Sequence, residues 1–195
     1  ENLKGEYLNT LQELGATDLN GTTFFDRTNY FQTVPRNALD TALWLESDRM
    51  GHFKGSITQA KLDEQRGVVQ NEKRQGDNEP YGKVFEMILK QLFPPDHPYS
   101  WEAIGSMEDL NAASLDDVRH WFETWYGPNN AVIVIAGDVD SDEAVAKAEK
   151  YFGDIAPGPA ATRLEEWIPI HAQPRRQQMQ DRVAQPRLYF SWNVA

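Results

Sequence analysis

Glu72 is the residue of this sequence whose position points most directly to chemistry. A helix is predicted over 59–75, and its 100° steps place Gln65 and Glu72 on the apolar face that Leu62 and Val69 define. A carboxylate that faces a core is unfavourable unless a cation neutralises it. Two interpretations follow: a partly solvated or salt-bridged carboxylate near a helix end, or a carboxylate bound to a metal ion.

The histidines do not complete a metal site by their spacing. His52, His97 and His171 have no histidine partner three or four residues away, and His97 is expected to be a locally hydrogen-bonded loop residue. His120 begins the run HWFE, but Thr124 stands where a second ligand would be needed. His120 is therefore expected to be structural, in a helix rich in Trp and Phe.

A second polar group stands at the start of a predicted hairpin. Residues 22–34 are rich in Thr, Phe and Tyr, and they predict a β-hairpin that turns near Arg27 and Thr28 and ends at Pro35. Small polar residues open it: Asn20, Gly21, Thr22 and Thr23. By residue type alone these four fit an ordinary edge strand.

Periodicity elsewhere predicts the helices that must position these groups. The expected helices cover 6–14, 38–50 with a capping box of Asn37 and Asp40, a stretch from Pro80 with its apolar stripe at 84–92, one capped by Ser114 with Asp117, and one from Ser141. Phe85 and Leu89 are expected to be buried in the stripe at 84–92.

Two apolar segments predict further strands. The run AVIVIA at 131–136 is continuous enough for a central strand buried on both faces, and 187–194 alternates like a strand. Residues 155–164 form a linker rich in Pro, Gly and Ala. The prediction is an α+β fold in which helices pack on one face of a mixed or antiparallel sheet, within one domain over 1–195 that is incomplete at both ends.

The amino-acid composition disfavours several classes of partner and site. The net charge of −11 disfavours binding to nucleic acid, and no apolar run reaches the roughly 20 residues of a membrane span. There is no cysteine, so disulfides and thiolate metal sites are excluded. The compartment is open between cytoplasm and periplasm, and the start at Glu1 without Met slightly favours the periplasm if a leader was removed.

Five segments in order resemble the pitrilysin/insulinase family of zinc metallopeptidases, peptidase family M16, to which mitochondrial processing peptidase is related. They are ENLKGE at 1–6, NGTT at 20–23 with TNY at 28–30, QRGVVQNE at 65–72, HPY at 97–99 with IG at 104–105, and WYGPNNAVIVIAGD at 125–138. The resemblance covers nearly the whole chain and implies the LuxS/MPP-like metallohydrolase fold, in an N-terminal peptidase domain.

The resemblance also implies roles. Glu72 matches the family's third zinc ligand, and Asn20, Gly21, Thr22 and Thr23 match a strand that binds extended peptides by strand addition. Implied partners are a peptide substrate and a remaining half of the peptidase, in the same chain or a second subunit. Zinc would be bound as one ion in the intact protein, and absent or weak in this chain.

The sequence departs from the family pattern in two places. There is no HxxEH helix, which in the family supplies two His ligands and the general base and lies just before the position of Glu1. Gln65 stands where the family often has a second acid. The implied function is a zinc-dependent endopeptidase domain that is inactive alone, and the alternative is a non-catalytic partner or scaffold subunit.

Overall fold

The computed structural model describes residues 7–162 and 167–194, which divide into two compact units. The first unit contains 7–23, 27–62 and 113–162 of these, and the second contains 24–26, 63–112 and 167–194. The expected α+β class is confirmed, because helices accompany a small antiparallel sheet. No helix within the described ranges is long and apolar enough to cross a membrane.

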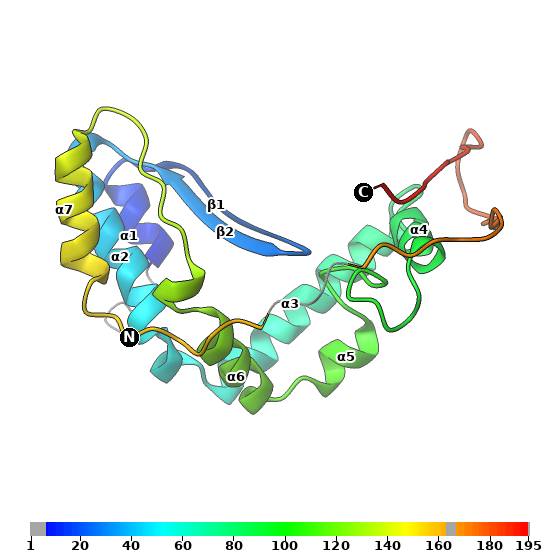
Figure 1. Cartoon of the computed structure of the whole chain (residues 1–195), viewed down its shortest axis with the longest axis horizontal. Coiled ribbons are helices and arrows are strands. Elements are labelled where there is room, and N and C mark those ends of the chain that lie inside the picture. The colour runs from blue at the N-terminus through cyan, green and yellow to red at the C-terminus, as the bar shows by residue number, and fades with distance from the viewer. Residues whose placement is uncertain (1–6, 163–166, 195) are drawn as a thin grey trace. The chain divides into compact units, whose positions relative to one another are not determined.

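The core of the first unit forms where two helices meet the base of a hairpin. Leu11 of α1 (Tyr7–Glu13) packs against Ala42 and Leu45 of α2 (Leu39–His52). Leu19 of β1 (Thr17–Phe24) and Val34, which follows β2 (Arg27–Thr33), pack against these buried residues. Figure 1 shows α7 (Ser141–Phe152) beside α2, on which it packs. The hairpin is therefore anchored at its base on the helical core.

The predicted hairpin is confirmed, but its turn lies earlier than expected. The two strands flank Phe25 and Asp26, so the loop has two residues instead of turning at Arg27 and Thr28. β1 also begins at Thr17, five residues before the predicted start. Residues 20–23 are consequently inside a strand.

Helix capping was predicted correctly at one of two places. Ser114 and Asp117 form a capping box at the start of α6 (Leu115–Trp125). The capping box of Asn37 and Asp40 is wrong, because Ala38 is the N-cap of α2 and η1 (Arg36–Ala38) precedes it. Asp40 instead accepts hydrogen bonds from α7, so a tertiary partner takes the carboxylate that local spacing assigned to a cap.

The apolar run at 131–136 is the main correction to the predicted fold. It follows η3 (Pro128–Asn130), and its backbone is extended at Ala131, but no described segment pairs with it and it forms no strand. Val132 and Val134 are 88% and 82% exposed. A β-strand forms only when its backbone hydrogen-bonds to a neighbouring strand. The described residues supply no neighbour for 131–136, so this apolar segment stays unpaired despite its strand-like sequence.

The second unit is built on the long helix α3 (Gln59–Asn78), of which 63–78 belong to it. Arg66 Nε donates to the carbonyl of Leu110 in α5 (Met107–Ala112) at 2.9 Å, and Gln70 Nε2 donates to Asn111 Oδ1 at 2.8 Å. Buried Lys73 lies 3.5 Å from Asp77 and 3.8 Å from Glu102. Polar contacts therefore define the covered stripe of α3.

The helix α4 (Val84–Leu92) confirms the predicted apolar stripe in part. Leu89 is buried, as predicted, and Val84 is buried as well. Phe85 is 44% exposed, so its predicted burial is wrong. The ring of Phe85 lies at the edge of an aromatic group, 6.4 Å from the ring of Phe25. The helix begins at Val84 and not at Pro80, since 80–83 form turns.

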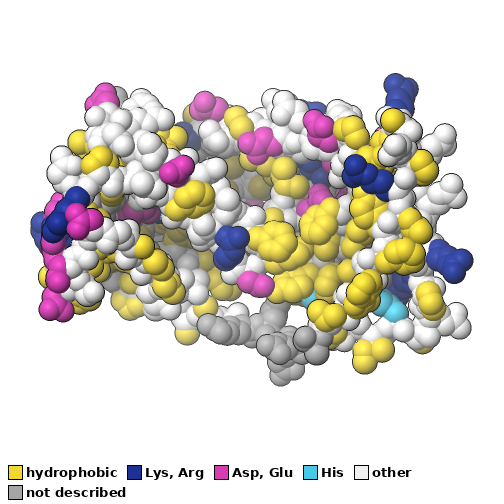
Figure 2. Space-filling view, turned by 90° about the horizontal axis from the view of Figure 1, so that it is seen from above, with side chains coloured by type: hydrophobic (Ala, Val, Ile, Leu, Met, Phe, Trp, Pro, Cys, Tyr) yellow, Lys and Arg dark blue, Asp and Glu magenta, His cyan; other side chains and the backbone are white. Residues whose placement is uncertain are grey.

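The C-terminal part of the second unit is extended but forms no strand, contrary to the prediction for 187–194. Four alternate side chains are more than 70% exposed: Leu188, Phe190, Trp192 and Val194. Figure 2 shows hydrophobic side chains gathered at the right of the view, the side on which Figure 1 places α4. The alternation is strand-like, and no described segment pairs with this one.

Candidate functional site

The predicted peptide-binding residues share an open strand edge. Asn20, Gly21, Thr22 and Thr23 lie in β1 and are all exposed. Within the described ranges β2 is the single neighbour of β1, so the other edge of β1 has no strand partner. The backbone N–H of Gly21 donates to Asn20 Oδ1 at 2.8 Å. Such an edge has the hydrogen-bonding groups that strand addition uses. Peptide binding by these four residues stays a prediction.

The hairpin face carries a polar ladder. Thr23 Oγ1 and Thr28 Oγ1 lie 3.0 Å apart, and Arg27 donates to Thr22 Oγ1 at 3.2 Å and also to Asn29. These contacts join β1 to β2 through side chains. None of them covers the open edge of β1, where a peptide that pairs with the N–H of Gly21 would replace its contact with Asn20 Oδ1.

Tyr30 of β2 lies over β1 at Gly21. A Cβ atom placed on Gly21 would stand 3.2 Å from Cδ1 of Tyr30, so the absence of a side chain at Gly21 lets the ring lie there. The guanidinium carbon of Arg49 stands 3.5 Å from the centroid of the same ring, and the Tyr30 hydroxyl lies 2.8 Å from the hydroxyl of Tyr126. Tyr30 thus joins the hairpin to α2 and to the residue after α6.

Arg49 is itself held in place on α2. It forms an ion pair with Glu46 one turn earlier, and Glu46 accepts a hydrogen bond from the hydroxyl of Tyr7. Burial raises the pKa of Tyr7, and burial followed by the hydrogen bond with Tyr30 raises the pKa of Tyr126. Both hydroxyls therefore stay protonated at neutral pH. Sequence patterns missed this cluster, and its local signal is the Glu46 and Arg49 pair at i, i+3.

Glu72 is exposed, so its predicted burial on the inner face of α3 is wrong. The covered stripe runs through Arg66, Gln70 and Lys73, and Glu72 precedes Lys73 by one 100° step. Among the described residues Glu72 pairs with no cation. Its carboxylate is open to an external partner, and its role as a zinc ligand stays a prediction.

The two predicted parts of the site belong to different units. Residues 20–23 are in the first unit and Glu72 is in the second. Their expected proximity therefore stays a prediction.

His97 is structural, as expected for a loop residue with local bonds. It is buried, its Nδ1 accepts from the backbone N–H of Tyr99 at 3.0 Å, and its Nε2 lies 3.0 Å from the carbonyl of Trp167. Because Nδ1 accepts, the proton of the neutral ring is on Nε2, which donates to Trp167. Both ring nitrogens are occupied. His171 Nε2 is likewise 2.8 Å from the carbonyl of Leu92.

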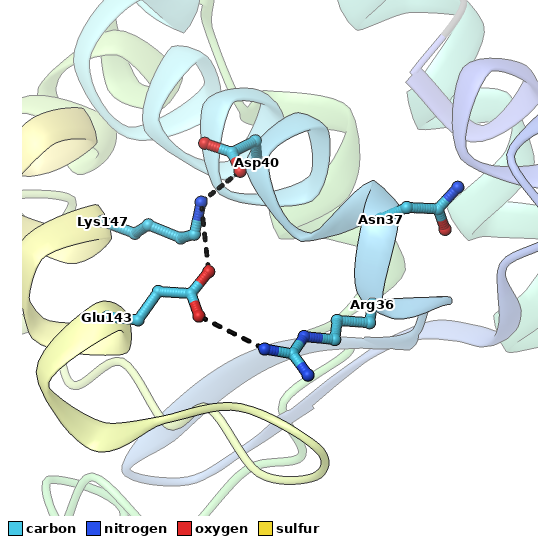
Figure 3. Close-up of a pocket in the computed structure, with 5 residues that line it drawn as sticks. All are labelled: Arg36, Asn37, Asp40, Glu143 and Lys147. Atoms are coloured by element: carbon cyan, nitrogen blue, oxygen red, sulfur yellow. Dashed lines mark hydrogen bonds and ion pairs between the residues drawn. The ribbon is translucent and has the colours of Figure 1, made fainter.

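A charged depression of about 530 Å³ lies between α2 and α7 in the first unit (Figure 3). Lys147 pairs with Asp40 and lies 3.6 Å from Glu143, and Arg36 lies 3.6 Å from Glu143. The two cations and two carboxylates neutralise one another. The depression therefore joins two helices and offers no surplus charge to a ligand.

This network predicts a pH dependence of stability. Hydrogen bonds from Lys147 and then from Tyr151 lower the pKa of Asp40 to about 2. A folded pKa below the unfolded value contributes stability that is present above about pH 4 and is lost as the pH falls towards 2. The side chain of Asp40 is 45% exposed, so solvent limits the contribution to about 1 kcal/mol or less.

Asp40→Asn should therefore lower the free energy of unfolding by up to about 1 kcal/mol at pH 6 and leave it nearly unchanged near pH 2. Urea unfolding at both pH values measures the difference. Asp116→Asn is the control, because the side chain of Asp116 is 95% exposed and its ion pair with Arg119 spans 4.0 Å. An effect of Asp40→Asn that does not change with pH would contradict the assignment.

Comparisons with known proteins support the predicted family. A family model described as "Peptidase M16 inactive domain" matches residues 112–195. The chain is 31% identical over 157 residues to the zinc protease PqqE of Helicobacter pylori, covering 80% of this chain and 34% of that protein. A crystal structure of a protease from Helicobacter pylori superposes with a TM-score of 0.73 at 28% identity, covering 85% of this chain and 38% of the other.

The chain belongs to the M16 peptidase family. Its M16 fold is also seen in the first half of the periplasmic protease PqqL from Escherichia coli, with a TM-score of 0.69, 22% identity, and coverage of 82% of this chain and 34% of the other. The chain spans about a third of the length of the relative PqqE. Placement in the N-terminal domain stays a prediction.

The M16 relative named above is a zinc protease, so the fit of zinc to this chain matters. The described ranges contain no group of three or more His, Cys, Asp or Glu residues that could hold a metal ion. Glu72 has the right donor atom and is accessible, but one carboxylate falls short of the three protein ligands of a catalytic zinc. These residues alone therefore do not make a zinc site.

Proposed function

We propose that this chain is part of a zinc-dependent M16 endopeptidase and contributes to it a peptide-binding strand and one metal ligand. The observation that carries the proposal is the 31% identity to a zinc protease over 157 residues. The edge of β1 that has no strand partner among the described residues supports it, and so does the exposed carboxylate of Glu72, which pairs with no cation there. The substrate class is an extended peptide.

The role of β1 follows from backbone chemistry. An extended peptide that lies antiparallel or parallel to β1 at residues 20–23 would pair its N–H and C=O groups with the open edge. Exposed small side chains at these positions leave room for the peptide side chains. Main-chain pairing orients a scissile bond with little dependence on the sequence of the peptide, which suits a peptidase of broad specificity.

Glu72 would supply one carboxylate oxygen to the metal, and the other ligands would come from residues that this chain does not contain. Zinc in such enzymes polarises the scissile carbonyl and activates water. Because Glu72 alone is not a complete set of zinc ligands, we also propose that this chain works together with a remaining half of the peptidase. The proposal gives this chain a contributing role and no complete catalytic centre.

This chain alone should cleave no peptide and should bind zinc weakly, because a single carboxylate is a poor zinc site. Metal content after dialysis and cleavage of a quenched extended peptide test this directly. The full-length protein, assayed in parallel, should cleave the peptide in a chelator-sensitive way. Stoichiometric tight zinc in the isolated chain, or robust cleavage by it, would show that the ligand set is wrong.

A second candidate is a non-catalytic M16 partner subunit. The specific observation in its favour is the match of residues 112–195 to a family model described as an inactive domain. A full-length protein without zinc and without chelator-sensitive cleavage supports this candidate over the first. In that case the open edge of β1 would serve subunit or peptide binding without hydrolysis.

A further inference from the structure

We propose that Arg49 is a positioning residue for the peptide-binding strand, because it clamps the Tyr30 ring onto β1 at Gly21. The inference rests on the proposed function and concerns the same strand. Arg49 is on α2 and is not part of β1, the strand that would bind the peptide. Its effect on a peptide would therefore pass through Tyr30.

The first step is the contact at Gly21. Gly21 is in the middle of the predicted peptide-binding residues, and a Cβ atom there would stand 3.2 and 3.4 Å from two carbons of the Tyr30 ring. The ring therefore lies directly over the backbone of β1 at this position. A change in the position of the ring changes the support under the strand that would receive the peptide.

The second step is the way the ring is held. The guanidinium of Arg49 stands 3.5 Å from its centroid, which is within the range of a cation–π contact. Arg49 pairs with Glu46, while its buried Nε has no hydrogen-bond partner among the described residues. The Tyr30 hydroxyl is fixed 2.8 Å from Tyr126, whose ring stacks on Phe122 at a centroid distance of 4.4 Å.

The third step is the exposure of the hairpin. Tyr30 is 42% exposed and residues 20–23 are all exposed, so little apolar burial holds this part of the hairpin. Leu19 at its base packs on the core, but Gly21 has no side chain to pack. The clamp from Arg49 therefore adds a tertiary contact to the restraint that pairing with β2 and its side-chain ladder place on β1.

The experiment compares variants of the full-length protein. Arg49→Met is made together with Glu46→Gln, so that no unpaired carboxylate remains on α2, and Glu46→Gln alone is the reference. Arg49→Lys keeps a cation near the ring, and Tyr30→Leu removes the ring. Arg36→Met is the matched control, because Arg36 is also in the first unit and pairs with Asp138 and Glu143.

Two quantities are measured: hydrogen exchange of the β1 amides that pair with β2, without peptide, and the KM and kcat for an extended quenched peptide. Arg49→Met, which removes the cation, should speed exchange of these amides and raise KM about tenfold. A tenfold change corresponds to the energy of a partly desolvated cation–π contact. The kcat should change less than twofold. Arg49→Lys should recover most of both effects. Arg36→Met should change neither.

A double-mutant cycle tests whether Arg49 acts through Tyr30. Once Tyr30→Leu is present, the substitution of Arg49 should raise KM no further. Additive effects would overturn the proposed route. If Arg49→Met unfolds the protein, Tyr30→Leu becomes the deciding variant, because it removes the ring that Arg49 holds. Unchanged exchange and KM in Tyr30→Leu would make Arg49 merely structural and refute the proposal.

The two proposals fail in different ways. Peptide should protect β1 amides of the wild-type protein from exchange, and absence of protection would refute the strand-binding function itself. Protection in the wild type, combined with unchanged exchange and KM in the Arg49 variants, would refute only the positioning role of Arg49.

Discussion

Glu72→Gln in the full-length protein should reduce peptidase activity at least about 100-fold, because loss of even an outer-shell partner of a metal costs 10–100-fold in affinity or activity. Glutamine keeps the shape of the side chain but lacks the anionic oxygen that zinc binds. Glu72 is exposed and pairs with no cation in the described parts of the chain, so the fold should survive. The measurement is kcat/KM on a quenched peptide, with excess zinc restoring part of the activity.

Glu64→Gln is the matched control on the same helix. Glu64 is exposed on α3 two helical turns before Glu72, and the same substitution there should leave activity within about twofold. Full activity in Glu72→Gln would make Glu72 a simple surface carboxylate. Equal losses in both variants would point to a general effect of charge on α3.

Leu45→Ala should destabilise the first unit by about 2–5 kcal/mol, the range for large-to-small substitutions in a packed core. Leu45 is 2% exposed and packs with Leu11 and Ala42 beneath the base of the hairpin. The measurement is the free energy of urea unfolding. Leu8→Ala, at a position 55% exposed on α1, should change it by less than about 0.5 kcal/mol.

A near-neutral Leu45→Ala would show that the contact of α1 with α2 does not hold the unit together. The prediction matters for function because Leu19 and Val34 pack on this same core at the base of the hairpin. A looser core should also weaken the anchor of β1. Faster exchange of β1 amides in Leu45→Ala would follow from that loss.

Local patterns predicted the parts of the fold that local contacts determine. The hairpin, the helix at 84–92 and the capping box of Ser114 with Asp117 depend on neighbours within a few residues, and all three are present. The strand prediction for 131–136 was wrong because a strand needs a pairing partner, and the sequence of the segment itself does not show whether one is present. The same holds for 187–194.

The site residues show a second limit of sequence patterns. On α3 the half-buried Leu62 and Val69 lie at one side of the covered stripe. Arg66 and Lys73 extend it in the direction away from Glu72, through hydrogen bonds and ion pairs that an apolar pattern does not predict. Glu72 was therefore placed on the wrong side of the helix. The contact of Arg49 with Tyr30 joins residues 19 positions apart, and no periodicity links them.

Zinc stoichiometry of the full-length protein tests the central claim most directly. Elemental analysis after dialysis should find one zinc per chain in the wild type and in Glu64→Gln, and well below half that amount in Glu72→Gln. After removal of zinc with a chelator, all three proteins should unfold at the same urea concentration, because bound zinc itself would stabilise the folded state. One full zinc per chain in Glu72→Gln would contradict the claim that this chain contributes a ligand to the metal site.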